Sequence, residues 1–200
     1  MALKIQSLKL KNLLTFALAL CAFVAGLYFA LKKDTENNAN FIFNHTFASN
    51  IQAKRLADFS QDYLILDFWA SWCIPCIDSL PHYIELFENY PINSVSWLAV
   101  NQDTTQQQAD SFIEKHQLDD LPVFYDTQGL LLRSFSIRGL PTLLILNPQR
   151  EIIDKIVGYD KAKEQQTAAK IQRVITADKL ADKLADKLAD RALQTETAAN

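Results

Sequence analysis

The feature that most constrains the fold is an apolar run followed closely by two cysteines. Residues Tyr63–Trp69 (YLILDFW) are apolar apart from one aspartate, and this density predicts a buried strand. Cys73-Ile74-Pro75-Cys76 comes three residues later, and Cys76–Tyr90 has the apolar spacing of a helix. The order strand, turn, helix predicts that the cysteine pair opens a helix that packs on a sheet. The buried face of that helix should carry Ile77, Leu80, Ile84 and Phe87, and Pro81 should kink it.

The spacing of the two cysteines indicates redox chemistry. A cysteine at a helix N-terminus lies near unpaired backbone N–H groups and the positive end of the helix dipole, which favour its thiolate. We therefore expect Cys73 to be the attacking, exposed thiol. Cys76 should be the more buried thiol that resolves the mixed disulfide. Pro75 suits the first turn of a helix, where a backbone N–H is not needed.

A zinc half-site or a pair of structural thiols is the alternative interpretation. Zinc usually needs four ligands, and the sequence has no second Cys-x-x-Cys and no closely spaced pair among its three histidines. Three cysteines are also too few for a disulfide scaffold. We expect no metal, and no cofactor beyond a redox-active Cys73–Cys76 disulfide.

Strand-like and helical segments alternate along the rest of the chain. This alternation predicts an α/β layer structure with a largely parallel centre. A turn at Asn147-Pro148-Gln149-Arg150 joins the last two strands, which should form an antiparallel hairpin at one side. The expected strands are Val95–Val100, Pro122–Tyr125, Thr142–Leu146 and Glu151–Val157, and the expected helices are Thr104–His116 and Lys161–Ile175.

An apolar segment precedes this domain. Residues 13–31 are apolar except for Thr15 and, at about 1.5 Å per residue, would span roughly 28 Å, close to the thickness of a bilayer core. We interpret 13–31 as a transmembrane helix, 1–12 as a short cytoplasmic segment and 32–45 as a linker. Lysines before the run favour an N-terminus inside, so that the domain faces outward. Cleavage of the segment, as in a signal peptide, is the alternative.

The end of the chain has a composition of its own. Ala-Asp-Lys-Leu repeats from Ala177 to Leu188 and places leucines four residues apart. We interpret 177–200 as a low-complexity, amphipathic helical tail without chemistry. Weak self-association or a partner helix is the alternative.

Three motifs resemble those of the thioredoxins, and in particular the membrane-tethered TlpA/ResA-like branch. The segment Asp67-Phe68-Trp69-Ala70-Ser71-Trp72-Cys73-Ile74-Pro75-Cys76 is similar to the active-site strand, turn and helix start of that family. Gly139-Leu140-Pro141-Thr142 is similar to its second motif, and Gly158 follows the last strand as the family's glycine does. The resemblance covers residues 46–176 and implies a thioredoxin fold, a central mixed β-sheet flanked by helices.

The resemblance also implies a substrate groove beside the cysteines. The Leu140–Pro141 peptide bond would be cis and would lie against the disulfide. Trp72 would be a partly exposed platform, although simple core packing is the alternative. The residues expected to line the groove are Trp72, Pro75, Leu140, Pro141 and Thr142.

Asp67 falls where thioredoxins keep a buried carboxylate. Burial would raise the pKa of Asp67 and let it exchange protons with Cys76; an exposed or water-bridged Asp67 is the alternative. Some family members also have an acidic residue shortly after the next strand. Asp103 lies slightly early for that position, so we do not expect it to be catalytic.

The motifs together predict an extracytoplasmic thiol–disulfide oxidoreductase. We favour a protein-disulfide reductase that receives electrons from a membrane thiol carrier and acts on exported proteins with disulfides or thiols. It would be a single-pass protein of the cell inner membrane, held in the lipid bilayer by residues 13–31, with its catalytic domain in the periplasm. The net charge of −3 and the lack of a basic block argue against nucleic-acid binding.

Other functions are compatible with the same fold. A dithiol oxidase or isomerase would use the cysteine pair with the opposite electron flow, and its reduction potential would distinguish it. A peroxiredoxin-like peroxidase would have a threonine a few residues before the reactive cysteine, where this chain has Ala70-Ser71-Trp72. A non-catalytic thioredoxin-like adaptor would not need an intact cysteine pair.

Overall fold

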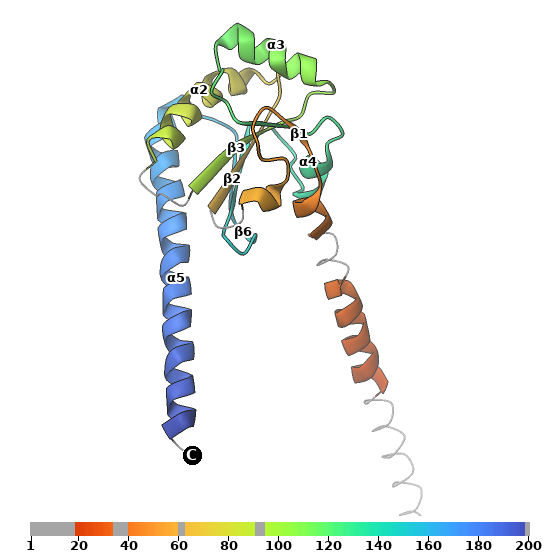
Figure 1. Ribbon diagram of the computed structural model, residues 1–200, viewed down its shortest axis with the longest axis vertical. Helices are drawn as coiled ribbons and strands as arrows, with labels where there is room; N and C mark the ends of the chain where they lie inside the picture. Colours follow the sequence, from red (N-terminus) through yellow and green to blue (C-terminus); the bar gives the residue numbers. More distant parts are fainter. Residues whose placement is uncertain (1–18, 34–39, 60–62, 91–94, 199–200) are drawn as a thin grey trace, which may run out of the picture. The chain divides into compact units, whose positions relative to one another are not determined.

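A six-stranded mixed sheet forms the centre of the compact unit His45–Asn200 (Figure 1). It is seen in a computed structural model that describes residues 19–33, 40–59, 63–90 and 95–198. In spatial order the strands are β1 (Ala48–Ser49), β4 (Val123–Tyr125), β3 (Val95–Asn101), β2 (Tyr63–Trp69), β5 (Thr142–Leu146) and β6 (Ile152–Val157). The β2, β3 and β4 strands are parallel, whereas β1, β5 and β6 pair antiparallel with their neighbours. The predicted α/β sheet, with its parallel centre and its hairpin at one side, is confirmed.

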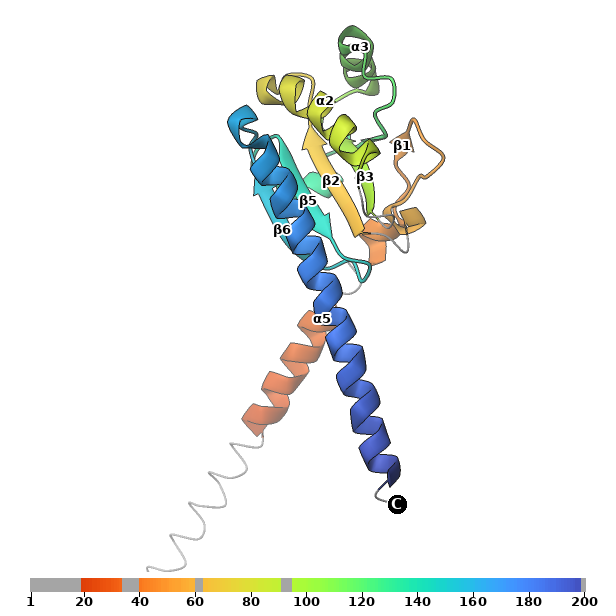
Figure 2. The same ribbon diagram turned by 90° about the vertical axis from the view of Figure 1, so that its left-hand side faces the viewer.

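Three long helices lie over one face of the sheet. They are α2 (Ile74–Glu88), α3 (Gln106–His116) and α5 (Glu164–Ala198), and Figure 2 shows α5 crossing the face of β5 and β6. Side chains alternate along a strand, so Ile65 and Trp69 of β2 point to this same face. Ile65 packs in a cluster with Ile171 of α5, and the ring of Trp69 lies 5.2 Å from that of Phe112 of α3. The central strand is therefore covered by all three helices.

The opposite face carries a short helix that the sequence analysis did not predict. This helix, α4 (Leu130–Ser134), is followed by Phe135, whose ring contacts Phe68 edge-on. Asp126 accepts hydrogen bonds from the backbone N–H groups of Leu130, Leu131 and Leu132. A helix of five residues is too short to show a 3.6-residue period, so its start depends on this side-chain contact. The 3-10 turn η1 (Leu56–Phe59) was missed for the same reason, whereas η2 (Lys161–Lys163) forms the start of the helix predicted from Lys161.

The active-site helix differs in detail from the expectation. It begins at Ile74 instead of Cys76, and Pro81 lies inside it. Ile77 is exposed, so its prediction as a buried residue was wrong. The fully buried side chains are Cys76, Ser79, Leu80 and Tyr83. Leu80 was predicted, and Ile84 and Phe87 are partly buried against the core clusters. The buried face is therefore turned by less than one residue from the predicted face, toward the small side chains of Cys76 and Ser79.

The last helix is continuous through the predicted tail. Ile171 and Ile175 anchor α5 in the core beside Tyr63 and Tyr83. Beyond this anchor the helix extends past the sheet, and residues 180–191 are exposed (Figure 1). The expected helix over 161–175 and the expected helical tail therefore form one element, which begins at Glu164.

The N-terminal residues form a separate compact unit, Met1–Asn44. Residues 19–33 and 40–44 are helical, and the side chains of 19–33 are exposed. None of the helices in the described part of the chain combines the length and apolar character that a membrane crossing requires. The expected cytoplasmic segment 1–12, residues 13–18 of the expected span, and 34–39 of the expected linker lie outside the described residues.

Candidate active site

The two cysteines stand where β2 gives way to α2. A turn over Ala70–Cys73 closes with a hydrogen bond from the Cys73 N–H to the Ala70 carbonyl. Cys73 is the N-cap residue of α2, and its backbone is still extended (φ −85°, ψ 101°). Pro75 occupies the first turn, where the absence of a backbone N–H costs nothing. Cys73 therefore lies at the positive end of the helix dipole, as predicted.

Cys73 and Cys76 form a disulfide, with their Cα atoms 5.3 Å apart. Cys76 is fully buried and Cys73 is 4% exposed. The expectation of an exposed Cys73 was therefore wrong for the disulfide form, in which Cys73 belongs to a buried cluster with Trp69 and Cys76. Cys73 is still more exposed than Cys76. A thiolate of another molecule would therefore reach the sulfur of Cys73 before that of Cys76.

Exposed apolar side chains surround the disulfide. Trp72 is 66% exposed and Ile74 is 78% exposed, and Pro75 and Ile77 are exposed as well. The alternative of simple core packing for Trp72 is excluded by this exposure. Ile74 and Ile77 were not predicted as site residues. For Ile74, its position between the two cysteines at the start of a helix could have indicated that it lies at the site. Large apolar groups left in water beside a reactive pair suit contact with a protein substrate.

The loop before β5 brings the second motif to the cysteines. The Leu140–Pro141 peptide bond is cis, as the resemblance implied. Leu140 packs against the buried cluster that contains both cysteines, and Pro141 and Thr142 are buried. The Thr142 hydroxyl donates to the Gly139 carbonyl (2.7 Å), and the Gly158 N–H donates to the Pro141 carbonyl (2.8 Å). Gly158 has φ +81°, a conformation that glycine adopts readily.

Asp67 is a fully buried carboxylate in the middle of the sheet. It lies on β2 between Ala99 of β3 and Leu143 of β5, so its exposure as an alternative is excluded. Within the described residues, neither of its oxygens has a hydrogen-bond partner. Burial raises the pKa of Asp67 to about 8. The pKa of Tyr83 on α2 is raised too, first by burial and then by the Asp67 charge. Asp67 shares a face of β2 with Ile65 and Trp69, which pack against α2, so Asp67 lies beneath the active-site helix.

The comparisons with known proteins agree with this geometry. The thioredoxin-like family profile matches residues 61–152, which hold the cysteine pair and the cis proline. Over these residues the chain is similar to the thioredoxin-like family, and its fold is the thioredoxin fold. The thiol-disulfide oxidoreductase ResA of a Bacillus cereus strain is 28% identical over 126 residues, 63% of this chain and 70% of that protein. The sporulation thiol-disulfide oxidoreductase A of Bacillus subtilis (strain 168) is 34% identical over 103 residues, 50% of this chain and 62% of that protein.

A solved structure supports the same assignment. A Chlorobium tepidum protein assigned as a thiol:disulfide interchange protein DsbE superposes with a TM-score of 0.60 at 25% identity. The match covers 65% of this chain and 92% of that protein. The matched part corresponds in size to the thioredoxin-like domain.

In this thioredoxin-like domain, Asp103 holds the turn before the cysteines. Its carboxylate accepts hydrogen bonds from the Ser71 N–H (3.0 Å), the Ser71 hydroxyl (2.8 Å) and the Asn101 amide (2.8 Å). The Gln102 N–H donates to the Trp69 carbonyl (2.8 Å). The contact ties the end of β3 to the turn that positions Cys73. The sequence analysis missed this role because the partners lie 32 residues apart.

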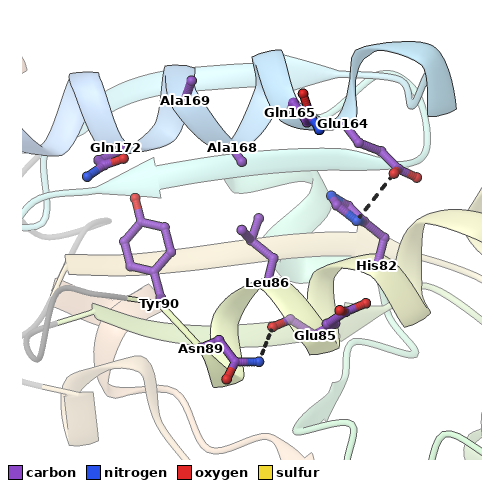
Figure 3. Close-up of a pocket in the computed structure, with 10 residues that line it drawn as sticks. All are labelled: His82, Glu85, Leu86, Asn89, Tyr90, Glu164, Gln165, Ala168, Ala169 and Gln172. Carbon is purple, nitrogen blue, oxygen red and sulfur yellow. Dashed lines mark hydrogen bonds and ion pairs between the residues drawn. The ribbon is translucent and has the colours of Figure 1, made fainter.

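A polar cluster joins the active-site helix to α5. His82 Nδ1 lies 3.7 Å from a Glu164 carboxylate oxygen (Figure 3). The Tyr159 hydroxyl donates to the same carboxylate. The cluster borders a groove of about 760 Å³ between the two helices. Neither cysteine and no residue of the loop 139–142 lines this groove, so it is separate from the redox site. Among the residues that the structure describes, no group of three or more histidine, cysteine or acidic side chains is arranged to hold a metal ion.

Proposed function

We propose that this protein is a thiol–disulfide oxidoreductase that exchanges dithiols and disulfides through Cys73 and Cys76. The observation that carries the proposal is the disulfide at the N-terminus of α2, with the cis Pro141 loop and exposed apolar side chains around it. Its relatives are named thiol-disulfide oxidoreductases. No cofactor beyond the disulfide itself is part of the proposal.

The exchange proceeds through a mixed disulfide. In the reduced protein, the Cys73 thiolate attacks one sulfur of a substrate disulfide, a Cys73–substrate disulfide forms, and the other substrate sulfur leaves as a thiolate. Cys76, as a thiolate, then attacks Cys73 Sγ and releases the second substrate sulfur. The substrate gains two electrons and ends as a dithiol, while the protein ends with the Cys73–Cys76 disulfide. The helix dipole at the N-cap stabilises the Cys73 thiolate in the first step.

Asp67 is proposed to take the proton that Cys76 must lose before it resolves the mixed disulfide. A base works best when its pKa lies near the working pH, and burial brings the pKa of Asp67 to about 8. An ordinary exposed aspartate would be too weak a base for a thiol. Because Asp67 lies under α2, on which Cys76 is also buried, the proton can pass within the protein interior.

The substrate is proposed to bind over the exposed side chains next to Cys73. Trp72 and Ile74 offer apolar contacts, and Leu140 packs against the buried cluster that contains both cysteines. An extended substrate segment could pair with the backbone of Leu140, as a strand adds to a sheet edge. Contacts of this kind favour unfolded or flexible polypeptides over small thiols.

We further propose that the protein acts as a reductase outside the cytoplasm. Residues 13–31 would anchor it in the inner membrane, and the domain would work in the periplasm on exported proteins. A membrane thiol carrier would return two electrons to the Cys73–Cys76 disulfide after each turnover. A histidine between the two cysteines would stabilise the thiolate and make the couple more oxidising. This chain has Ile74-Pro75 there, without a histidine, which favours a reductase.

The chemistry is tested by insulin-disulfide reduction with the full chain in non-ionic detergent. Cys73→Ser should abolish activity because it removes the attacking thiolate. Cys76→Ser should instead accumulate the mixed disulfide, which mass spectrometry detects. Activity that survives Cys73→Ser would exclude the assigned nucleophile.

The substrate surface is tested by Trp72→Ala. This variant should keep the disulfide exchange with a small thiol but lower the rate with insulin by roughly tenfold, which corresponds to about 1.4 kcal/mol of lost contact.

The direction of electron flow is tested by the reduction potential of the Cys73–Cys76 couple. A value of about −250 mV or lower, near that of thioredoxin at about −270 mV, supports a reductase. A value near about −120 mV, as in a strong oxidant, would make the protein an oxidase or isomerase.

A further inference from the structure

The distal half of α5 carries a surface that the redox site does not use. Ala-Asp-Lys-Leu repeats from Ala177 to Leu188 within one continuous helix. Each residue turns the helix by about 100°, so every fourth residue returns to nearly the same side. The repeat therefore forms four stripes, in the order alanine, aspartate, lysine, leucine around the helix. Because four residues turn by about 40° more than one full turn, all four stripes wind slowly around the helix axis in the same sense and keep their order along the repeat.

The leucine stripe faces solvent. Leu180, Leu184 and Leu188 are 67%, 58% and 57% exposed. The domain contacts a different side of the helix, because the Tyr63 hydroxyl donates to Asp178 and Lys179 lies over the Tyr63 ring. The neighbouring alanines widen the leucine stripe into one apolar face. Large apolar side chains repeated on one side of a helix gain stability only when another surface covers them.

The charges of the repeat form two flanks of opposite sign. Asp182 and Asp186 are four residues apart, and so are Lys183 and Lys187. Lysine and aspartate also lie three residues apart, as in Lys183 and Asp186, a spacing at which opposite charges stabilise a single helix by a few tenths of a kcal/mol. The repeat collects acids on the flank beside alanine and bases on the flank beside leucine. An apolar face with one acidic and one basic flank results.

Such flanks select both the partner and its direction. Two copies related by an axis parallel to the helices place the acidic flank of each against the basic flank of the other. Two antiparallel copies place acid against acid and base against base. Anionic lipid is a poor match, because the aspartates and basic residues from Asp178 to Arg191 are equal in number. We propose that the apolar face of the repeat binds the same face of a second copy of this chain, with the two helices parallel.

The contact should be short and the dimer weak. Ridges formed by residues four apart pack at a steep crossing angle, about −50°, which limits how many leucines meet. We expect a dissociation constant of the order of micromolar. The inference does not depend on the proposed redox function, so a failure of one leaves the other standing.

The surface is tested by sedimentation of the full chain in non-ionic detergent over a range of protein concentrations. Leu184→Ala with Leu188→Ala should weaken self-association by roughly tenfold or more, without loss of helix content in circular dichroism, because alanine favours helices. The matched control is Ile152→Ala with Val157→Ala, which removes exposed apolar side chains from β6 and should leave self-association unchanged. A wild-type chain that stays monomeric, or a dimer indifferent to the leucine changes, would overturn the proposal.

The parallel orientation of the two helices is tested by exchanging the acidic and basic residues of the two flanks. The variant Asp182→Lys, Lys183→Asp, Asp186→Lys, Lys187→Asp keeps the composition, the net charge and the leucines. In a parallel pair this variant dimerises with itself as well as the wild type does. A mixed parallel pair sets like charges face to face, so mass-tagged wild-type and exchanged chains should sort into separate dimers in native mass spectrometry. Mixed dimers in excess of the statistical share would show an antiparallel pair and overturn the proposed direction.

Discussion

At the scale of the residue, the buried Asp67 makes the stability of the protein depend on pH. Burial raises the pKa of Asp67 from 3.8 to about 8, so the folded protein holds a proton that the unfolded chain releases between these values. The stability that this proton contributes is complete below about pH 4 and is lost as pH rises toward 8, with a slope of at most about 1.4 kcal/mol per pH unit.

We predict that Asp67→Asn removes this loss, because the amide cannot ionise. The variant should be more stable than the wild type at pH 8 and above, in urea unfolding measured across pH 4 to 9. It should also slow resolution of the mixed disulfide by Cys76, because the proposed base is gone. Asp119→Asn, which removes a carboxylate from the surface, is the control and should keep the wild-type slope. An unchanged slope in Asp67→Asn would show that Asp67 is not the group that titrates.

At the scale of the element, α4 depends on one side chain. The buried carboxylate of Asp126 accepts from the first three backbone N–H groups of this helix, and Lys155 Nζ donates to the Phe135 carbonyl (2.9 Å) at its other end.

We predict that Asp126→Ala destabilises the domain by about 1–3 kcal/mol, because it leaves buried N–H groups without an acceptor. Asp126→Asn should cost less, and Asp120→Ala, at an exposed site, should cost almost nothing. Thermal unfolding gives all three values; equal losses for Asp126→Ala and Asp120→Ala would contradict the assigned role.

At the scale of the whole molecule, the chain has two compact units, and the first holds the apolar run 13–31. We predict that the chain stays with the membrane after alkaline extraction. Leu20→Arg with Val24→Arg should release it, since each central arginine costs about 2.5–3.5 kcal/mol of insertion. Ile152→Arg, on the exposed surface of β6, should leave it in the membrane. A wild-type chain in the soluble fraction, or a mass showing cleavage after Ala30, would rule out the anchor.

The sequence by itself determined the parts of this protein that depend on neighbours along the chain. The apolar run of β2, the cysteine spacing and the proline at the second motif each carry their signal within a few residues. A strand buried on both faces, a helix dipole at Cys73 and a cis bond before Pro141 follow from that signal and from the family it resembles. The burial of Asp67 was expected from the resemblance to thioredoxins, with an exposed carboxylate as the alternative, and only the structure decided between the two.

The tertiary structure decided what depends on residues far apart. It turned Ile77 outward and Ser79 inward, because the sheet selects which side of α2 it covers. It also buried Cys73, placed the Asp126 carboxylate on the first N–H groups of α4 and joined Asp103 to the turn before the cysteines. Periodicity tells which residues share a face, whereas burial and polar contacts depend on which distant groups reach that face. For this reason the reactive pair was visible in the sequence, and the side chains that hold it in position were not.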